Sequence, residues 1–130
     1  MIGMQNAYAL LAAASLGASR RLHLVEIAEG LTKCKPLPGR LNLIEGARGT
    51  LLIDDSYNAS PIATLAALNT LETIQAKRKI AVLGDMLELG KYTTEEHRKI
   101  GEAACKVADV VVGVGLRAKY MSEAAQKQFH

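Results

Sequence analysis

The sequence predicts an α/β fold in which helices flank a parallel sheet. Short apolar runs, of the kind that buried strands show, alternate with longer segments whose apolar residues recur at helical spacing. The apolar runs are residues 51–53, 80–83 and 110–114, and the helical segments are 61–75, the segment opening at 93, and 117–128. Strands that alternate with helices in this way build parallel sheets with helices on their faces.

Composition narrows the class of protein. The chain has 130 residues, of which 49% are hydrophobic, so a globular fold with its own core is expected. The net charge of +3 is spread along the chain, and one Phe and no Trp leave few platforms for stacking bases. We therefore expect no nucleic-acid partner.

The cysteines and the apolar stretches bear on the cellular compartment. Cys34 and Cys105 lie far apart and lack CxxC spacing, so reduced thiols are favoured over a disulfide or a metal site. No stretch has the length of a membrane span, and no export signal is visible. These features predict a cytoplasmic protein without membrane insertion.

Residues 1–38 are predicted to hold two helices. Residues 5–18 are rich in Ala and Leu, with Gly17 placed to end the helix, and residues 24–31 carry one apolar face. We place a domain boundary after Pro38. Two helices of this size are too small to form a stable unit alone. They are predicted to be the tail of another domain, with a helical cap on the second domain as the alternative.

The second predicted domain, residues 39–130, opens with a hairpin and a helix start. Strands 41–45 and 50–54 are predicted to pair across the turn 46–49. Ser60 can cap the next helix, and Pro61 suits its first position. Further along, Thr93 and Glu96 form a plausible capping box.

The turn at 54–58 follows a predicted strand, where ligands of open α/β sheets bind. Asp54 and Asp55 could contact a ribose or a metal-bound phosphate, and turn formation with helix capping explains them equally well. Tyr57 and Asn58 offer a ring and an amide suited to a purine, although residues of these types occur more often simply as loop residues.

Four other side chains are candidates, each with a structural alternative. Arg40 at the predicted boundary could clamp a phosphate, or be a surface residue. Asp85 and Glu88 lie in a loop after a strand, where ligand contact and loop capping are equally favoured. His97 shares a face with apolar residues, so a packed, hydrogen-bonded histidine is expected rather than a catalytic one.

Two glycine patterns resemble nucleotide-binding loops. The segment 84–91 places five residues between its glycines where a phosphate loop has four, and Tyr92 stands where Ser or Thr is needed. Residues 113–118 match G-x-G-x-x-A, but the next strand and its acidic residue are absent from the sequence. We reject the first pattern and interpret the second as a structural turn.

Four motifs together resemble the Mur ligase family, and within it the ligases that add D-alanyl-D-alanine. They are Gly39-Arg40-Leu41-Asn42, Ile53-Asp54-Asp55-Ser56-Tyr57-Asn58-Ala59-Ser60-Pro61, Ala81-Val82-Leu83-Gly84-Asp85-Met86-Leu87-Glu88-Leu89-Gly90, and Glu96-His97 with Gly101. Residues 3–18 also resemble the end of the family's central ATPase domain.

The resemblance implies a domain assignment. Residues 1–38 would be the helical tail of the central ATPase domain, and residues 39–130 a Rossmann-like C-terminal domain that is incomplete at its C-terminus. The phosphate-binding loop and the magnesium ligands would lie outside these 130 residues.

The resemblance also implies a reaction. ATP, with Mg²⁺, phosphorylates the carboxylate of UDP-MurNAc-tripeptide, and the amine of D-alanyl-D-alanine then attacks the acyl phosphate. The 130 residues alone would be inactive, and the intact enzyme is expected to be a monomer. Chemistry of this kind relies on positioning and charge neutralisation, which suits a closing lid domain.

Residue roles carry over from the resemblance only where the motifs match. Asn6 would lie near the adenine, Arg40 at the ATP phosphates and Asp55 at the ribose, with Tyr57 and Asn58 beside the nucleotide. Gln5 and Ala9 depart from the His and Asn that are usual in the family's motif at residues 3–18, which weakens the adenine assignment.

The same carry-over gives Asp85, Glu88 and His97 a supporting role in the lid or at the amine site. No catalytic residue and no metal ligand is assigned within the chain. Two other functions stay open: a stand-alone binding or regulatory module with this lid fold, and, more weakly, a small dinucleotide-binding protein built on residues 113–118.

Overall fold

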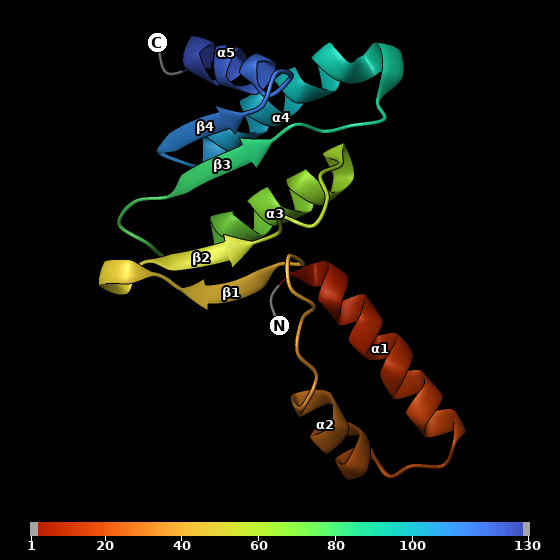
Figure 1. The fold of residues 1–130 in the computed structure, drawn as a ribbon. Helices are drawn as coiled ribbons and strands as arrows, with labels where there is room; N and C mark the ends of the chain where they lie inside the picture. Colours follow the sequence, from red (N-terminus) through yellow and green to blue (C-terminus); the bar gives the residue numbers. More distant parts are fainter. Residues whose placement is uncertain (1–2, 129–130) are drawn as a thin grey trace. The chain divides into compact units, whose positions relative to one another are not determined.

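The computed structural model describes residues 3–128, within which the chain forms five α-helices and four strands (Figure 1). The chain divides into two compact units, residues 1–54 and 55–130. The boundary predicted from the sequence, after Pro38, lies inside the first unit and stays a prediction.

The first unit begins with α1 (Met4–Ser19) and α2 (Leu24–Thr32), which pack against each other. The sequence predicted that Gly17 ends this helix, but α1 continues to Ser19. A Cβ at Gly17 would lie 3.0 Å from Cγ1 of Ile27. The missing side chain of Gly17 therefore lets Ile27 of α2 pack closely against α1. The chain turns two residues after α1 ends, where Arg21 takes a left-handed conformation with φ 63°.

The predicted hairpin is confirmed in the same unit. Strands β1 (Asn42–Glu45) and β2 (Leu51–Asp54) pair antiparallel, with Asn42 opposite Asp54 and Glu45 opposite Leu51. The short helical turn η1 (Ala47–Gly49) joins them. Because β2 ends at Asp54, the candidate turn at 54–58 follows directly after the hairpin.

The second unit is a βαβ arrangement with one helix before it and one after it, and it confirms the predicted α/β class. It comprises α3 (Pro61–Thr73), β3 (Ile80–Gly84), η2 (Gly90–Tyr92), α4 (Thr93–Val107), β4 (Val110–Val114) and α5 (Lys119–Gln128). Strands β3 and β4 pair in parallel, from Ile80 opposite Val110 to Gly84 opposite Val114. Helix α4 crosses between them and contacts α3, α5 and β4 (Figure 1).

The core of the second unit lies between α3, α4, α5 and one face of the β3–β4 pair. Its buried members are Leu68, Ala81, Met86, Ile100, Ala104, Ala108, Ala118 and Met121. Small residues bring the two helices together, because a Cβ at Gly101 would overlap the backbone of Met121. The apolar residues of the opposite sheet face are exposed: Ile80, Val82, Val112 and Val114.

Candidate functional site

The backbone around Arg40 is fixed on both sides. The N–H of Gly39, a residue with φ 71°, donates to Oδ2 of Asp54 at 3.2 Å. On the other side Leu41 is 3% exposed and also adopts a positive φ of 46°. The Arg40 side chain itself is exposed. Of the two adjacent aspartates, Asp54 therefore has a structural role, because its carboxylate binds the backbone N–H of Gly39.

The turn after β2 leads into a capped helix, as the sequence predicted. Asp55 is partly buried and the Tyr57 ring is 70% exposed. Oδ1 of Asn58 accepts the N–H of Ala59 at 2.9 Å. Oγ of Ser60 accepts the N–H of Ala63 at 3.3 Å, and α3 begins at the following proline.

The predicted nucleotide residues fall in both units. Asn6 and Arg40 belong to the first unit, and Asp55, Tyr57 and Asn58 belong to the second. That these five side chains meet on one nucleotide stays a prediction.

Asp85 joins two loops of the second unit. Its Oδ1 accepts the N–H groups of Arg117 at 2.9 Å and Ala118 at 2.7 Å, and its Oδ2 lies 3.8 Å from the guanidinium of Arg117. A Cβ at Gly115, whose φ is 119°, would overlap this carboxylate. Asp85, in the loop after β3, thus caps the start of α5. Loop capping was the structural alternative that the sequence offered for this residue.

The G-x-G-x-x-A pattern at 113–118 is explained by the same contact. Dinucleotide loops bind a pyrophosphate through free N–H groups at a helix start. Here the carboxylate of Asp85 takes those N–H groups, and a Cβ at Gly113 would lie 2.5 Å from the carbonyl oxygen of Ala118. Both glycines therefore serve close packing, in agreement with the structural-turn interpretation.

Asp85 also makes stability depend on pH. Partial desolvation opposes its ionisation, but hydrogen bonds from the N–H groups of Ala118 and Arg117, and the charge of Arg117, outweigh this and lower its pKa. Because the pKa of Asp85 is lower in the fold than in the unfolded chain, where it is about 4, the ionised carboxylate stabilises the fold at pH values above about 4. This stabilisation is lost as the pH falls through the pKa that Asp85 has in the fold. An Asp85→Asn variant should therefore be less stable than the wild type at pH 7, and the difference should shrink at about pH 3.

Urea unfolding at the two pH values measures this difference. Glu102→Gln, an exposed change on α4, serves as the control and should leave stability almost unchanged at both. An Asp85→Asn deficit of the same size at pH 3 and pH 7 would show that the ionised carboxylate does not stabilise the fold.

His97 is fully buried and hydrogen-bonded through both ring nitrogens. The N–H of Met86 donates to Nε2 at 3.1 Å, and Nδ1 lies 2.6 Å from the carbonyl oxygen of Thr93. Since Nε2 must accept, the proton of the neutral ring is on Nδ1 and is donated to Thr93. The expected packed histidine is confirmed, and it fastens the loop after β3 onto the first turn of α4.

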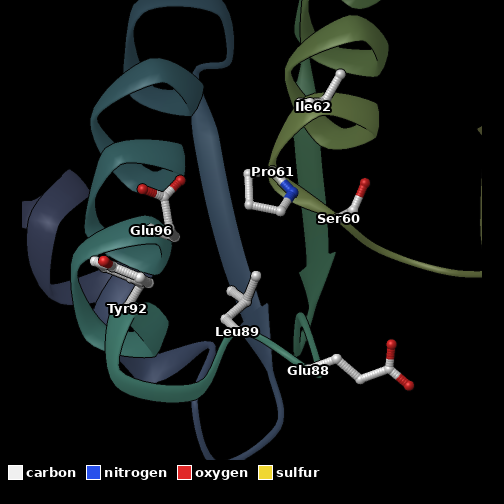
Figure 2. A pocket seen from close by; sticks show the side chains of 7 residues that line it. All are labelled: Ser60, Pro61, Ile62, Glu88, Leu89, Tyr92 and Glu96. Carbon is white, nitrogen blue, oxygen red and sulfur yellow. The ribbon is translucent and has the colours of Figure 1, made fainter.

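A pocket of about 440 Å³ opens between the start of α3, the loop after β3 and the start of α4 (Figure 2). It is lined by Ser60, Pro61, Ile62, Glu88, Leu89, Tyr92 and Glu96. The backbone of Glu88 is held at a φ of 63°. Of the predicted site residues, Glu88 alone lines this pocket. Ile62 lies far from Leu89, Tyr92 and Glu96 in the sequence, and only the fold brings the start of α3 beside that segment.

The predicted capping box at Thr93 is wrong. Helix α4 begins at Thr93 without a side-chain cap, and the hydroxyl of Thr93 donates to the carbonyl oxygen of Gly90 at 2.7 Å. Glu96 instead pairs with Lys99 at 2.8 Å, and Lys99 contacts Glu95 at the same distance. Glu96 therefore does not cap the helix start; it pairs with Lys99 and lines the pocket.

Three further properties concern metals, membranes and thiols. Residues 3–128 contain no cluster of three or more His, Cys, Asp or Glu side chains that could hold a metal ion. None of the described helices is long and apolar enough to cross a membrane. Cys34 and Cys105 are free thiols.

Curated relatives with the same name match almost the whole chain. The UDP-N-acetylmuramoyl-tripeptide–D-alanyl-D-alanine ligase of Escherichia coli K12 is 40% identical over 124 residues, which cover 95% of this chain and 27% of the relative. The ligase of that name from Bacillus subtilis 168 is 34% identical over 131 residues, covering 99% and 29%. The chain thus spans less than a third of the length of these relatives.

Solved structures agree in fold and in identity. A crystal structure of MurF from Acinetobacter baumannii matches with a TM-score of 0.82 and 35% identity over 96% of this chain and 27% of that one. MurF ligase from Thermotoga maritima in complex with ADP matches with a TM-score of 0.64 and 36% identity over 70% and 21%. The family described as "Mur ligase, glutamate ligase domain" matches residues 39–130. The chain therefore belongs to the Mur ligase family.

Proposed function

We propose that this chain is part of an ATP-dependent ligase that adds D-alanyl-D-alanine to UDP-MurNAc-tripeptide in peptidoglycan precursor synthesis. The observation that carries the proposal is the 40% identity to the Escherichia coli ligase of that name, over 95% of this chain. Because the chain spans 27% of that relative, the 130 residues are expected to be inactive alone. We also propose that the intact protein is a cytoplasmic monomer.

The exposed side chains fit a nucleotide. Tyr57 presents its ring to solvent beside Asp55, and Arg40 presents a guanidinium on a fixed backbone. We assign the ribose to Asp55, the phosphates to Arg40 and the adenine side to Asn6, Tyr57 and Asn58. ATP with Mg²⁺ would supply the phosphoryl group that activates the peptide carboxylate. The similarity to a ligase solved with ADP supports an adenine nucleotide as the ligand.

An Asp55→Asn change in the intact ligase tests the function and the nucleotide assignment together. The wild type should release phosphate only when UDP-MurNAc-tripeptide and D-alanyl-D-alanine are both present. In the variant the KM for ATP should rise about tenfold, because a hydrogen bond to a charged group contributes about 1.5 kcal/mol or more. Steady-state phosphate release at varied ATP concentration measures it.

Asp54→Asn is the matched control, since Asp54 holds the backbone of Gly39. It should lower the urea midpoint of unfolding. A normal KM for ATP in a folded Asp55→Asn enzyme would remove the ribose role. Phosphate release that ignores D-alanyl-D-alanine would refute the proposed activity.

A further inference from the structure

We propose that Leu41 is a positioning residue of the nucleotide site, whose buried side chain and left-handed backbone hold the neighbouring Arg40 in the direction of the ATP phosphates. This inference rests on the proposed function, which assigns the phosphates to Arg40. It adds a buried apolar residue that acts only through its neighbour. All the contacts that carry the inference lie within the first unit.

Leu41 has a backbone conformation that leucine rarely adopts. Its φ is 46°, a region where the side chain of an L-residue crowds its own backbone. Three other non-glycine residues within 3–128 have a positive φ, namely Arg21, Arg48 and Glu88, and all three are exposed, whereas Leu41 is 3% exposed. Strained residues persist only where their surroundings hold them, and they gather at functional sites.

A tight turn fixes the chain just before Leu41. The N–H of Arg40 donates to the carbonyl oxygen of Leu37 at 3.1 Å, and Pro38 and Gly39 occupy the two positions between them. Proline holds its own φ at about −65°. Gly39 has a φ of 71°, so the sequence and the backbone both match a type II turn. The backbone of Arg40 is therefore set by the turn that it ends.

Asp54 braces this segment on both sides of Arg40. Its Oδ2 accepts the N–H of Gly39 at 3.2 Å, and Asp54 itself lies opposite Asn42 at the start of β1. Only Arg40 and Leu41 stand between these two contacts. Arg40 is exposed, while the residues on either side of it are buried. The direction of Arg40 relative to the hairpin thus depends on the conformation of Leu41.

A relaxed Leu41 would redirect Arg40. A move of its φ from 46° to about −60°, the value of ordinary right-handed backbone, would rotate the preceding chain by roughly 100°. Arg40 would turn with that chain, and the hydrogen bond from Gly39 to Asp54 would be lost. A guanidinium binds phosphate through parallel hydrogen bonds of fixed geometry, so its direction matters. The buried side chain of Leu41 opposes this rotation.

Leu41→Gly in the intact ligase tests the positioning role. Glycine accepts a positive φ but lacks the side chain that holds the segment, so Arg40 should sample other directions. The kcat/KM for ATP should fall about tenfold or more, because misplacing a positioned group by about 1 Å can cost about a hundredfold. Leu41→Met keeps the apolar volume and should stay within about threefold of the wild type. Steady-state phosphate release at varied ATP concentration measures these values.

A double-mutant cycle with Arg40→Ala separates positioning from general structural support. If Leu41 acts through Arg40, Leu41→Gly should cost less than about twofold in kcat/KM for ATP once residue 40 is alanine. Equal losses in both backgrounds would overturn the positioning role. Arg48→Gly is the matched control, since it changes another residue of the first unit with a positive φ, 58°. It should leave kcat/KM for ATP unchanged in both backgrounds.

Leu41→Val keeps the test decisive if Leu41→Gly does not fold. Valine retains a buried apolar side chain, but its branched Cβ tolerates a positive φ less well than leucine does. Its kcat/KM for ATP should also fall about tenfold or more, and again only while Arg40 is present. Thermal midpoints above the assay temperature identify the variants that are folded during the measurement.

The outcomes separate the role of Leu41 from the proposed function. A wild-type enzyme that releases no phosphate with UDP-MurNAc-tripeptide and D-alanyl-D-alanine would refute the proposed activity itself. An active wild type with an impaired Arg40→Ala variant, but with normal Leu41→Gly and Leu41→Val variants, would overturn the positioning role and leave the activity standing. A normal kcat/KM for ATP in Arg40→Ala would overturn both the phosphate assignment and the role of Leu41.

Discussion

Replacing Gly101 by alanine is expected to lower the free energy of unfolding by about 2 kcal/mol. In a helix this change normally stabilises by about 1 kcal/mol. Here the new Cβ would lie 2.7 Å from Cα and 2.8 Å from the carbonyl carbon of Met121. Both partners are backbone, so the clash is relieved only by moving α4 away from α5, and overpacking of this kind costs about 3 kcal/mol.

Urea unfolding followed by circular dichroism measures the effect of Gly101→Ala. Gly30→Ala in α2 is the matched control, because no atom lies within 4 Å of its new Cβ. The control should stabilise by about 0.5 to 1 kcal/mol. If both variants were stabilised alike, the close approach of α4 and α5 would not hold in solution.

The second large effect is expected for His97→Ala, at about 3 kcal/mol of lost stability. The change empties a fully buried position and leaves the N–H of Met86 and the carbonyl oxygen of Thr93 without their partner. A cavity and a buried unsatisfied donor each destabilise by about 1 to 3 kcal/mol. The loop from Met86 to Tyr92 should loosen first, since this ring fastens it to α4.

Amide hydrogen exchange at Met86 gives a local measurement for His97→Ala. The Met86 amide should exchange faster by more than global destabilisation explains, while the amide of Ala81 in β3 reports the global change. Stability within about 0.5 kcal/mol of the wild type, with an unchanged Met86 amide, would contradict the role of the ring.

Local patterns in the sequence predicted most of the fold. The hairpin, the strand at 110–114 and the start of α3 at Pro61 depend on neighbouring residues: alternation, apolar runs and a Ser-Pro start. The predictions from the sequence were wrong where tertiary contacts, rather than neighbouring residues, determine the local structure. Gly17 looked like a helix end because glycine is common there, yet Ile27 of the next helix needs the space.

The candidate site was less predictable for the same reason. Asp85 accepts hydrogen bonds from Arg117 and Ala118, which follow it by 32 and 33 residues in the sequence. No local sequence pattern predicts partners at such a separation. The Thr93–Glu96 spacing matched a capping box, but Lys99 competes for the carboxylate. Glu88 could be singled out by its place after a strand, whereas its neighbours in the pocket depend on how α3 and α4 pack.

The carboxylate at the start of α5 has a consequence for solutes. Because Asp85 is covalently tethered, its effective concentration at the N–H groups of Arg117 and Ala118 is on the order of millimolar or more. A free anion would also have to give up its translational freedom to displace it. The amino end of α5 thus resembles an anion site whose ligand is part of the chain, and a free phosphate would have to displace the Asp85 carboxylate to bind there.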